Sequence, residues 1–426
     1  MFFVKPLGFL KPPLRIQALN DVSLKVFPGE VVAVVGESSG GKTTIGNVLT
    51  GILQPTLGRI LFEGEDIAAM RRQSSLASGA TLKSQLEFLW AVIAVALIHL
   101  AATVILVINR ATEVQEVSQA LFCLETPVLW LSLHLSLPRS SLLAIAAFNS
   151  VMAAFTVCVS FWYLVQWNVR RPIRKKLRAF RRQVQIVQQD AYAALNPVHT
   201  VAYSLATPLR RLGLVPSRKE AMKRVVELLE LVELRPVSQY VNKYPHQLSG
   251  GQRQRILLAR AISLGPKVIV ADEPVSMIDV SLRVSALNLM RKLNRELNIS
   301  FVYITHDLGT ARYIGREGRL MVLYLGKIVE TGGLRDVMGN PRHPYLQALL
   351  SSVPVPDPEI SRHRRKINLV NVEMPSIINP PPGCRFHTRC PFAQALCKES
   401  EPLLRTVETS EVACHFAEKI PRWTIA

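Results

Sequence analysis

The sequence predicts an α/β protein whose core is a parallel β-sheet. Three apolar runs indicate buried strands of such a sheet: VVAVVG at 31–36, VIVAD at 268–272 and FVYIT at 301–305. The first run enters a Gly-rich turn, after which TTIGNVLTGIL (43–53) has the apolar spacing of a helix. A strand, a tight turn and a helix in this order are the repeating unit of parallel α/β folds.

Residues 1–72 form the first part of the predicted domain, beginning with a β-rich segment. GRILFEGEDI (58–67) has the pattern of a β-hairpin with Gly64 at its turn, which indicates a small antiparallel β subdomain. The first 17 residues lack an apolar stretch long enough for a signal peptide, so we expect the N-terminus to stay in the cytoplasm.

Residues 174–338 continue the same domain. The segment 199–260 has helical periodicity, for example in KEAMKRVVELLELV (219–232), and predicts a helical subdomain. RLMVLYL (319–325) adds a strand, and GKIVETG (326–332) follows it as a hairpin strand. Residues 339–426 form a Pro-rich C-terminal extension with four of the six cysteines.

Between these parts, residues 73–173 form a hydrophobic insert. The stretches 86–108 and 141–167 are each long enough to cross a bilayer as a helix, whereas 121–137 is shorter. Both flanking parts must fold together on one side of the membrane, so the number of crossings must be even. We therefore expect two crossings, with 121–137 re-entrant or interfacial; a buried helical hairpin, or an insertion without a role, are the alternatives.

The charge is strongly basic, with 51 Lys and Arg against 31 Asp and Glu and a net charge of +20. Such an excess favours nucleic acid or an anionic membrane surface as a partner. The aromatic residues Trp162, Tyr163 and Trp167 are followed by a basic run at 170–176, as at the cytoplasmic end of a membrane helix. This placement favours the membrane.

GESSGGKTT (36–44) has the pattern of a phosphate-binding loop. Its glycines let backbone amides approach phosphate oxygens at the positive end of the next helix. Lys42 is expected to reach the β- and γ-phosphates, and the Thr43 hydroxyl to bind Mg²⁺. The expected nucleotide-contacting residues are Gly36, Ser38, Gly40, Gly41, Lys42, Thr43 and Thr44.

Two further motifs lie downstream. Asp272 ends a buried strand, where a carboxylate is costly unless it faces a cation, and Glu273 beside it is suited to polarise an attacking water. LSGGQ (248–252) places small residues at a predicted helix start, which is a second anion site.

A phosphate loop, then LSGGQ, then a strand ending in Asp-Glu resembles the ATP-binding-cassette (ABC) ATPases, a branch of the P-loop NTPases. The resemblance implies ATP and Mg²⁺ as ligands, with Mg²⁺ held through Thr43, Gln189 and Asp272. It also implies a dimer, because the signature residues act on the ATP held by the opposite subunit. These residues are Ser249, Gly250, Gly251 and Gln252.

The same resemblance assigns further roles. His306 in YITHDL matches the switch histidine that contacts the γ-phosphate. Gln189 in IVQQDAY matches the glutamine that links Mg²⁺ and the attacking water to the transmembrane subunits, and is expected to act in catalysis with Glu273 and His306; Gln188 is the neighbouring alternative. Asp279 matches the loop aspartate at the dimer interface. Phe9 is the candidate for stacking on the base.

The segments NPRHPYLQALLSSVPVPDPEI (340–360) and INPPPGCRFHTRCPFA (378–393) resemble the C-terminal region of oligopeptide/dipeptide permease ATPases. This implies an ATPase subunit at the cytoplasmic face of the cell membrane. Its implied partners are a second ATPase, two permease subunits and an extracellular substrate-binding protein. Peptides are the implied substrates, and nickel or oligosaccharides the alternatives.

Four cysteines of the extension, Cys384, Cys390, Cys397 and Cys414, are separated by 5, 6 and 16 residues. Because cytoplasmic thiols stay reduced, zinc or a [4Fe–4S] cluster explains them better than disulfides, and simply buried cysteines are the alternative. The family resemblance also implies a [4Fe–4S] cluster. His387 and His415 are substitute ligands, whereas Cys123 and Cys158 lie in apolar runs and are expected to pack.

Three other functions compete with an importer ATPase. An ABC ATPase acting on nucleic acid or ribosomes would suit the basic charge, but much of that charge flanks the apolar segments. A self-contained transporter would need more membrane crossings than the insert offers. An inactive, disrupted copy disagrees with the intact motifs on both sides of the insert.

Overall fold

A computed structural model describes residues 2–5, 14–38, 40–75, 90, 157, 159, 172–354, 359, 362 and 366–423. The chain divides into two compact units, Met1–Ala68 with Ala179–Ala426, and Ala69–Arg178. All residues predicted to contact nucleotide belong to the first unit.

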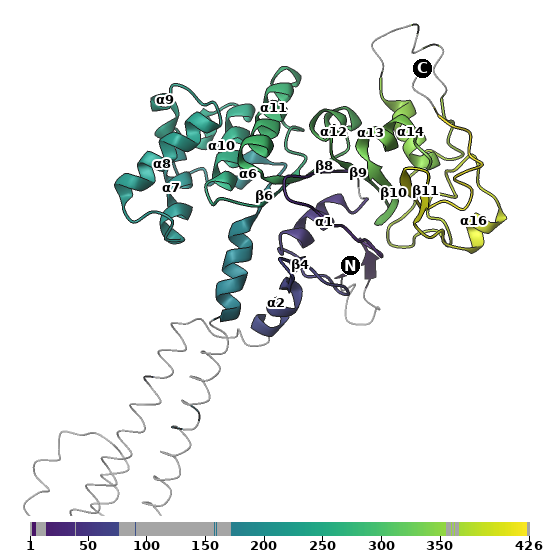
Figure 1. Cartoon of the computed structure of the whole chain (residues 1–426), viewed down its shortest axis with the longest axis horizontal. Coiled ribbons are helices and arrows are strands. Elements are labelled where there is room, and N and C mark those ends of the chain that lie inside the picture. Colours follow the sequence, from purple (N-terminus) through teal and green to yellow (C-terminus); the bar gives the residue numbers. More distant parts are fainter. Residues whose placement is uncertain are drawn as a thin grey trace, which may run out of the picture. The chain divides into compact units, whose positions relative to one another are not determined.

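The first unit is built on an eight-stranded mixed sheet with the strand order β11-β12-β10-β9-β3-β8-β7-β6 (Figure 1). The five strands from β9 to β6 are parallel, and β10, β12 and β11 continue the sheet in antiparallel pairs. These strands are β3 (Val31–Val35), β6 (Val184–Val187), β7 (Val268–Asp272), β8 (Ser300–Thr305), β9 (Arg319–Tyr324), β10 (Lys327–Gly333), β11 (Arg405–Val407) and β12 (Ser410–Val412). The predicted parallel core is confirmed.

Two small antiparallel sheets accompany it. One pairs β1 (Phe2–Lys5) with β2 (Leu14–Gln17). The other is the predicted hairpin, β4 (Leu61–Phe62) with β5 (Glu65–Asp66), and Gly64 at its turn has a φ of 82°.

Helices surround the sheet, and α7, α8 and α10 form the predicted helical subdomain beside the β6 edge (Figure 1). Leu205, Leu229 and Ile256 of these helices are fully buried in one cluster with Phe301 of β8. The helices are α1 (Lys42–Leu49), α2 (Ile67–Ser75), α6 (Ala191–Ala194), α7 (Val201–Arg211), α8 (Arg218–Leu231), α9 (Ser238–Val241), α10 (Gly250–Ile262), α11 (Val280–Leu297), α12 (Leu308–Ile314), α13 (Leu334–Gly339), α14 (Pro344–Ser352) and α16 (Ala395–Glu399), with a 3₁₀ turn at Pro245–Gln247.

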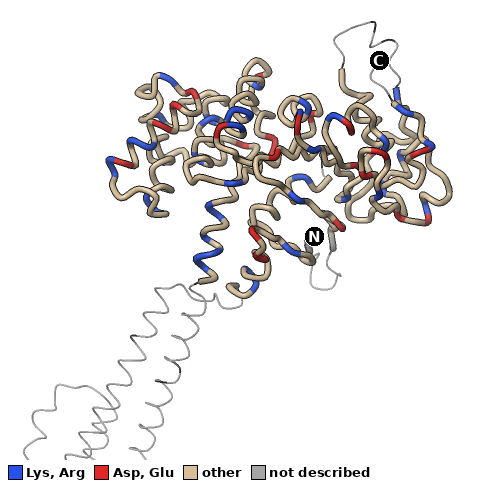
Figure 2. Tube along the Cα trace, viewed as in Figure 1, with Lys and Arg blue, Asp and Glu red and all other residues tan. Residues whose placement is uncertain are grey.

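Residues 172–183 are also helical and lead into β6. Lys and Arg recur along this helix (Figure 2), which accounts for part of the basic charge. Near its end, Phe180 is buried against Phe62 of β4, with the ring centroids 5.4 Å apart. This contact anchors the C-terminal end of the helix just before the chain enters strand β6.

The Pro-rich extension is a folded part of the first unit, because β12 pairs with β10 and extends the main sheet. The buried carboxylate of Glu330 on β10 accepts hydrogen bonds from the backbone N–H groups of Arg342 and His343, at 2.9 and 2.8 Å. Phe386 and Trp423 are buried in a shared apolar cluster with strand β9. These contacts hold the extension against the sheet.

The predicted membrane segments 86–108, 121–137 and 141–167 lie outside the described residues, apart from three isolated positions. Among the residues that the structure describes, no helix is long and apolar enough to cross a membrane. Phe9, Cys123 and Cys158 lie outside the described residues as well.

Candidate functional site

The phosphate loop connects β3 to α1, and two of its glycines are required by close backbone contacts. A Cβ on Gly36 would lie 2.1 Å from the Leu323 carbonyl oxygen, and one on Gly41 would lie 2.5 Å from the Ala18 carbonyl oxygen. Gly41 also has a φ of 93° and caps the start of α1. Only glycine fits these positions without displacing backbone, so the loop can fold closely around the helix N-terminus.

Lys42 points back into this loop. Its Nζ donates hydrogen bonds to the carbonyl oxygens of Gly36 and Glu37, at 2.7 and 2.8 Å. Burial lowers the pKa of Lys42, while the carboxylates of Glu273, Asp272 and Glu37 oppose that shift. Of the other predicted loop residues, Gly40 is buried, Thr44 is half-buried in the first turn of α1, and Ser38 is exposed.

Asp272 at the end of β7 faces the start of α1. Its carboxylate is hydrogen-bonded to the Thr43 side chain, and burial raises its pKa. Its Oδ1 is buried and has no hydrogen-bond partner among the described residues. A buried carboxylate oxygen without a partner, next to a hydroxyl, is a fitting pair of ligands for Mg²⁺.

The three residues predicted to be catalytic meet at one carboxylate. Glu273 Oε1 is 2.9 Å from His306 Nδ1, and Glu273 Oε2 accepts a hydrogen bond from Gln189 Nε2 at 3.2 Å. Glu273 itself has a φ of 44°, and its N–H donates to the Ile304 carbonyl oxygen at 2.9 Å. Gln188 is exposed beside Gln189, and the contact to Glu273 is made by Gln189.

A pocket opens beside this group. Its lining includes Glu273, Ser276, Arg283, Thr305 and His306. The sequence does not single out Arg283, which comes from the first turn of α11, because no local motif marks a helix residue that faces a site on another element.

The signature residues form the N-terminus of α10. The Ser249 hydroxyl accepts a hydrogen bond from the Gln252 N–H at 3.3 Å, and Gln252 Oε1 accepts one from the Ser249 N–H at 3.0 Å. Among the described residues, Ser249 is the side chain that caps this helix, and its hydroxyl binds the N–H of Gln252 alone. Gly250 lies against Met277, close to Asp279 at the start of α11.

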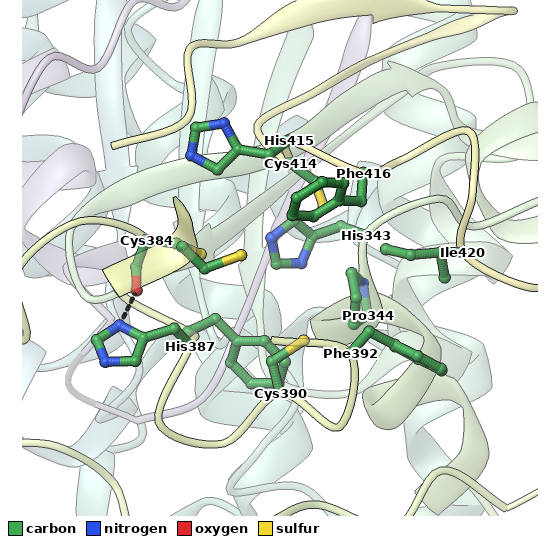
Figure 3. A pocket seen from close by; sticks show the side chains of 12 residues that line it. His343, Pro344, Cys384, His387, Cys390, Phe392, Cys414, His415, Phe416 and Ile420 are labelled. Atoms are coloured by element: carbon green, nitrogen blue, oxygen red, sulfur yellow. Dashed lines mark hydrogen bonds between the residues drawn. The ribbon is translucent and has the colours of Figure 1, made fainter. Parts of the chain in front are cut away.

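The four C-terminal cysteines line one pocket together with His387 and His415 (Figure 3). All four are free thiols. Burial raises the pKa of Cys390 and of Cys414 to about 12. His387 Nδ1 is 2.8 Å from the Cys384 carbonyl oxygen, as the dashed line in Figure 3 marks.

These thiols are gathered but not arranged around a single ion. Among the described residues, no three or more His, Cys, Asp or Glu side chains form a group that could hold a metal ion. The donor set of four cysteines in one pocket fits the ligand requirement of a [4Fe–4S] cluster.

One set of contacts to the phosphate loop was not predicted. The Arg389 guanidinium forms two hydrogen bonds with the Glu37 carboxylate, and the Tyr345 hydroxyl accepts one from the Glu37 N–H. Glu37 and Arg389 are 352 residues apart, so no local pattern could have linked them.

Two family descriptions match the chain. The family described as ABC transporter matches residues 19–122 and 164–276. The family described as oligopeptide/dipeptide transporter, C-terminal region, matches residues 329–397.

Three curated relatives illustrate the similarity. The oligopeptide transport ATP-binding protein OppF of Salmonella typhimurium is 32% identical over 406 residues, which are 95% of this chain and 90% of the relative. The di/tripeptide transport ATP-binding protein DppF of Pseudomonas aeruginosa is 31% identical over 412 residues, 97% of this chain and 94% of the relative. The putative oligopeptide transport ATP-binding protein YkfD of Bacillus subtilis is 44% identical over 250 residues, 58% of this chain and 74% of the relative.

Proposed function

Because this chain belongs to the ABC transporter ATPases, in the oligopeptide/dipeptide group, we propose that it binds and hydrolyses ATP to drive peptide import across the cytoplasmic membrane. The names of the relatives, which are oligopeptide and di/tripeptide transport ATP-binding proteins, support the peptide substrate. The site geometry supports the ATPase activity.

The observation that carries this proposal is the convergence of Gln189 and His306 on Glu273. The Glu273 carboxylate accepts a proton from the attacking water, which raises the nucleophilicity of that water. His306 and Gln189 hydrogen-bond the two oxygens of the carboxylate and thereby fix its direction. Lys42 and the amides of the phosphate loop neutralise the charge on the β- and γ-phosphates.

Asp272 and Thr43 are the residues that would hold Mg²⁺, with Gln189 nearby through its contact with Glu273. When bound, the ion supplies further charge neutralisation at the β- and γ-phosphates. The N–H groups at the start of α10, beside Ser249, Gly250 and Gly251, are suited to contact the nucleotide of a partner ATPase subunit. Asp279 would lie at the same interface.

Peptide uptake tests the function. In cells that lack this gene, the wild-type chain with its permease and binding-protein partners should restore uptake of a labelled oligopeptide. The Lys42→Ala chain should not, although it is made in equal amount. Uptake of nickel or an oligosaccharide in place of peptide would redirect the substrate, and salt-sensitive binding to RNA or DNA without any uptake would favour the nucleic-acid alternative.

We further propose that the hydrophobic stretches 86–108 and 141–167 attach this subunit to the membrane independently of the permease. Alkaline carbonate extraction of the chain expressed without partners tests this. Retention in the membrane pellet, lost on deleting residues 74–169, is the expected result. Release of the whole chain into the supernatant would refute membrane insertion.

The four C-terminal thiols support a [4Fe–4S] cluster as a further ligand of this chain. Anaerobic preparation should yield a coloured protein with iron and acid-labile sulfide in equal amounts. Replacing Cys390 by Ser should remove both, and a wild-type chain without sulfide would contradict the cluster.

A further inference from the structure

The segment 384–390 begins and ends at two of the four pocket cysteines, Cys384 and Cys390, and its Arg389 contacts the phosphate loop. The Arg389 guanidinium grips the Glu37 carboxylate with two bonds, Nη1 to Oε2 at 2.6 Å and Nη2 to Oε1 at 3.0 Å. The Arg389 side chain is only 4% exposed. It also lies over the rings of Tyr324 and Phe386, each 5.9 Å from the guanidinium carbon. The Glu37 side chain at the other end of the pair is 33% exposed. A pair with two parallel hydrogen bonds fixes both the position and the direction of the carboxylate.

Glu37 also contacts Lys42, so its position affects the position of the Lys42 ammonium. The Glu37 N–H donates to the Tyr345 hydroxyl at 2.8 Å, and its carbonyl oxygen accepts a hydrogen bond from Lys42 Nζ at 2.8 Å. Side chain, N–H and carbonyl of one residue are therefore all engaged. Because the side chain and the N–H of Glu37 are both bound by residues of the C-terminal extension, the extension determines where the loop places its carbonyl and hence the Lys42 ammonium.

A second arginine of the same segment acts on the other side of the loop. Arg385 donates to the carbonyl oxygen of Leu325 and, at 3.1 Å, to Oε1 of Gln17. The next residue, Gly326, donates its N–H to the Gly40 carbonyl oxygen at 3.0 Å. The turn between β9 and β10 thus connects Arg385 to the glycines that precede α1.

We propose that the segment Cys384–Cys390 is a positioning element of the ATP site, and that Arg389 acts on nucleotide affinity through Glu37. This inference rests on the proposed ATPase function. Arg389 does not touch the reacting atoms; it neutralises and orients the Glu37 carboxylate, a negative charge carried by the phosphate loop and felt at Lys42. Loss of Arg389 leaves the Glu37 carboxylate unpaired in the phosphate loop, and because this side chain is 33% exposed, water compensates part of its charge.

The test measures the dissociation constant of a non-hydrolysable ATP analogue with Mg²⁺ for the purified full-length chain. Arg389→Met should raise this constant roughly tenfold, since coupling between sites is commonly of that size. Adding Glu37→Gln to Arg389→Met should restore much of the affinity, because the unpaired carboxylate is gone. Arg389→Lys keeps the positive charge but cannot form two parallel hydrogen bonds with the carboxylate. Its dissociation constant should lie between those of the wild type and Arg389→Met.

Tyr345→Phe provides a milder variant that keeps the buried ring in place. It removes only the hydroxyl that accepts the Glu37 N–H. We expect a smaller rise in the dissociation constant, with hydrolysis at saturating ATP close to wild type. This split between affinity and turnover distinguishes positioning of the loop from general damage to the fold.

Arg405→Met is the matched control, because Arg405 makes a similar two-pronged pair with Glu418 in the same extension. It should leave nucleotide affinity unchanged. Unchanged affinity in Arg389→Met and Tyr345→Phe, or no recovery in the double variant, would overturn the inference. If instead the wild-type chain fails to bind the analogue, or binds it as well after Lys42→Ala, the proposed ATPase function itself is wrong.

Discussion

Asp272 shows how a single residue can reveal a ligand. Its carboxylate sits at the end of a buried strand, one oxygen is without a hydrogen-bond partner among the described residues, and burial raises its pKa. Folding therefore places a group where its charged form is disfavoured. A bound cation would offset that cost, which supports the proposal that Asp272 is a ligand of Mg²⁺.

Asp272→Asn should accordingly leave the fold intact and weaken the response to Mg²⁺. The concentration of Mg²⁺ needed for half-maximal ATP hydrolysis should rise roughly 10- to 100-fold. Asp336→Asn, at an exposed position on α13, is the control and should match wild type. Equal Mg²⁺ dependence in Asp272→Asn and wild type would show that Asp272 is not a ligand.

Residue identity predicts most of the ATP site, because each motif combines a turn, a charge and a strand end in one short segment. Gly36, Lys42 and Asp272 were predicted this way. Arg389 and Tyr345 were not, since their importance arises from contacts with Glu37 across more than 300 residues of sequence. Contacts between residues so far apart in the sequence produce no local periodicity or motif spacing from which they could be predicted.

At the level of elements, helix α10 combines a structural cap with the proposed contact to a partner's nucleotide. The Ser249 hydroxyl caps the helix, as the Ser217 hydroxyl caps α8 by accepting the Glu220 N–H at 3.1 Å. Because we propose only the capping role for Ser217, it serves as a control for the proposed second role of Ser249.

Ser249→Ala and Ser217→Ala should each cost about 1 kcal/mol of stability through the lost cap. Only Ser249→Ala should also reduce ATP hydrolysis measured with both ATPase subunits present, while ATP binding stays intact. Thermal unfolding and steady-state hydrolysis report the two effects separately. An equal loss of activity in both variants would mean that Ser249 acts only as a cap.

The contact between β10 and the extension predicts a pH dependence. Burial raises the pKa of Glu330 from 4.5 to about 7, so the folded chain holds this proton more tightly than the unfolded chain. The resulting stability is present below the unfolded pKa and is lost as the pH rises through about 7.

Glu330→Gln replaces the carboxyl by a neutral group of the same shape and should remove this dependence. The difference in unfolding free energy between wild type and the variant should fall by up to about 1.4 kcal/mol per pH unit between about pH 4.5 and 7. Unfolding curves over this pH range test it. Parallel profiles for the two chains would contradict a raised pKa at Glu330.

Element prediction succeeded where burial on both faces forces a continuous apolar run, as in β3, β7 and β8. It was poorest in the extension, where β11 and β12 have only three residues each and are held by pairing with β10. Strands this short carry too few residues for an alternating pattern. Their position depends on tertiary contacts instead.

For the whole molecule, the ATP site is assembled from four distant parts of the chain. The phosphate loop comes from the beginning of the chain, Gln189 follows the insert, and Glu273 and His306 end neighbouring strands of the sheet. The C-terminal extension then holds the phosphate loop through Arg389. We propose that this assembly hydrolyses ATP with Glu273 as the general base.

The most direct test compares Mg²⁺-dependent ATP hydrolysis and ATP binding in the wild-type chain, Glu273→Gln and the exposed control Glu317→Gln. Glu273→Gln should lower the turnover number by roughly 10²- to 10⁴-fold while ATP binding persists, and Glu317→Gln, at an exposed position, should match wild type. Near-normal hydrolysis by Glu273→Gln would contradict it.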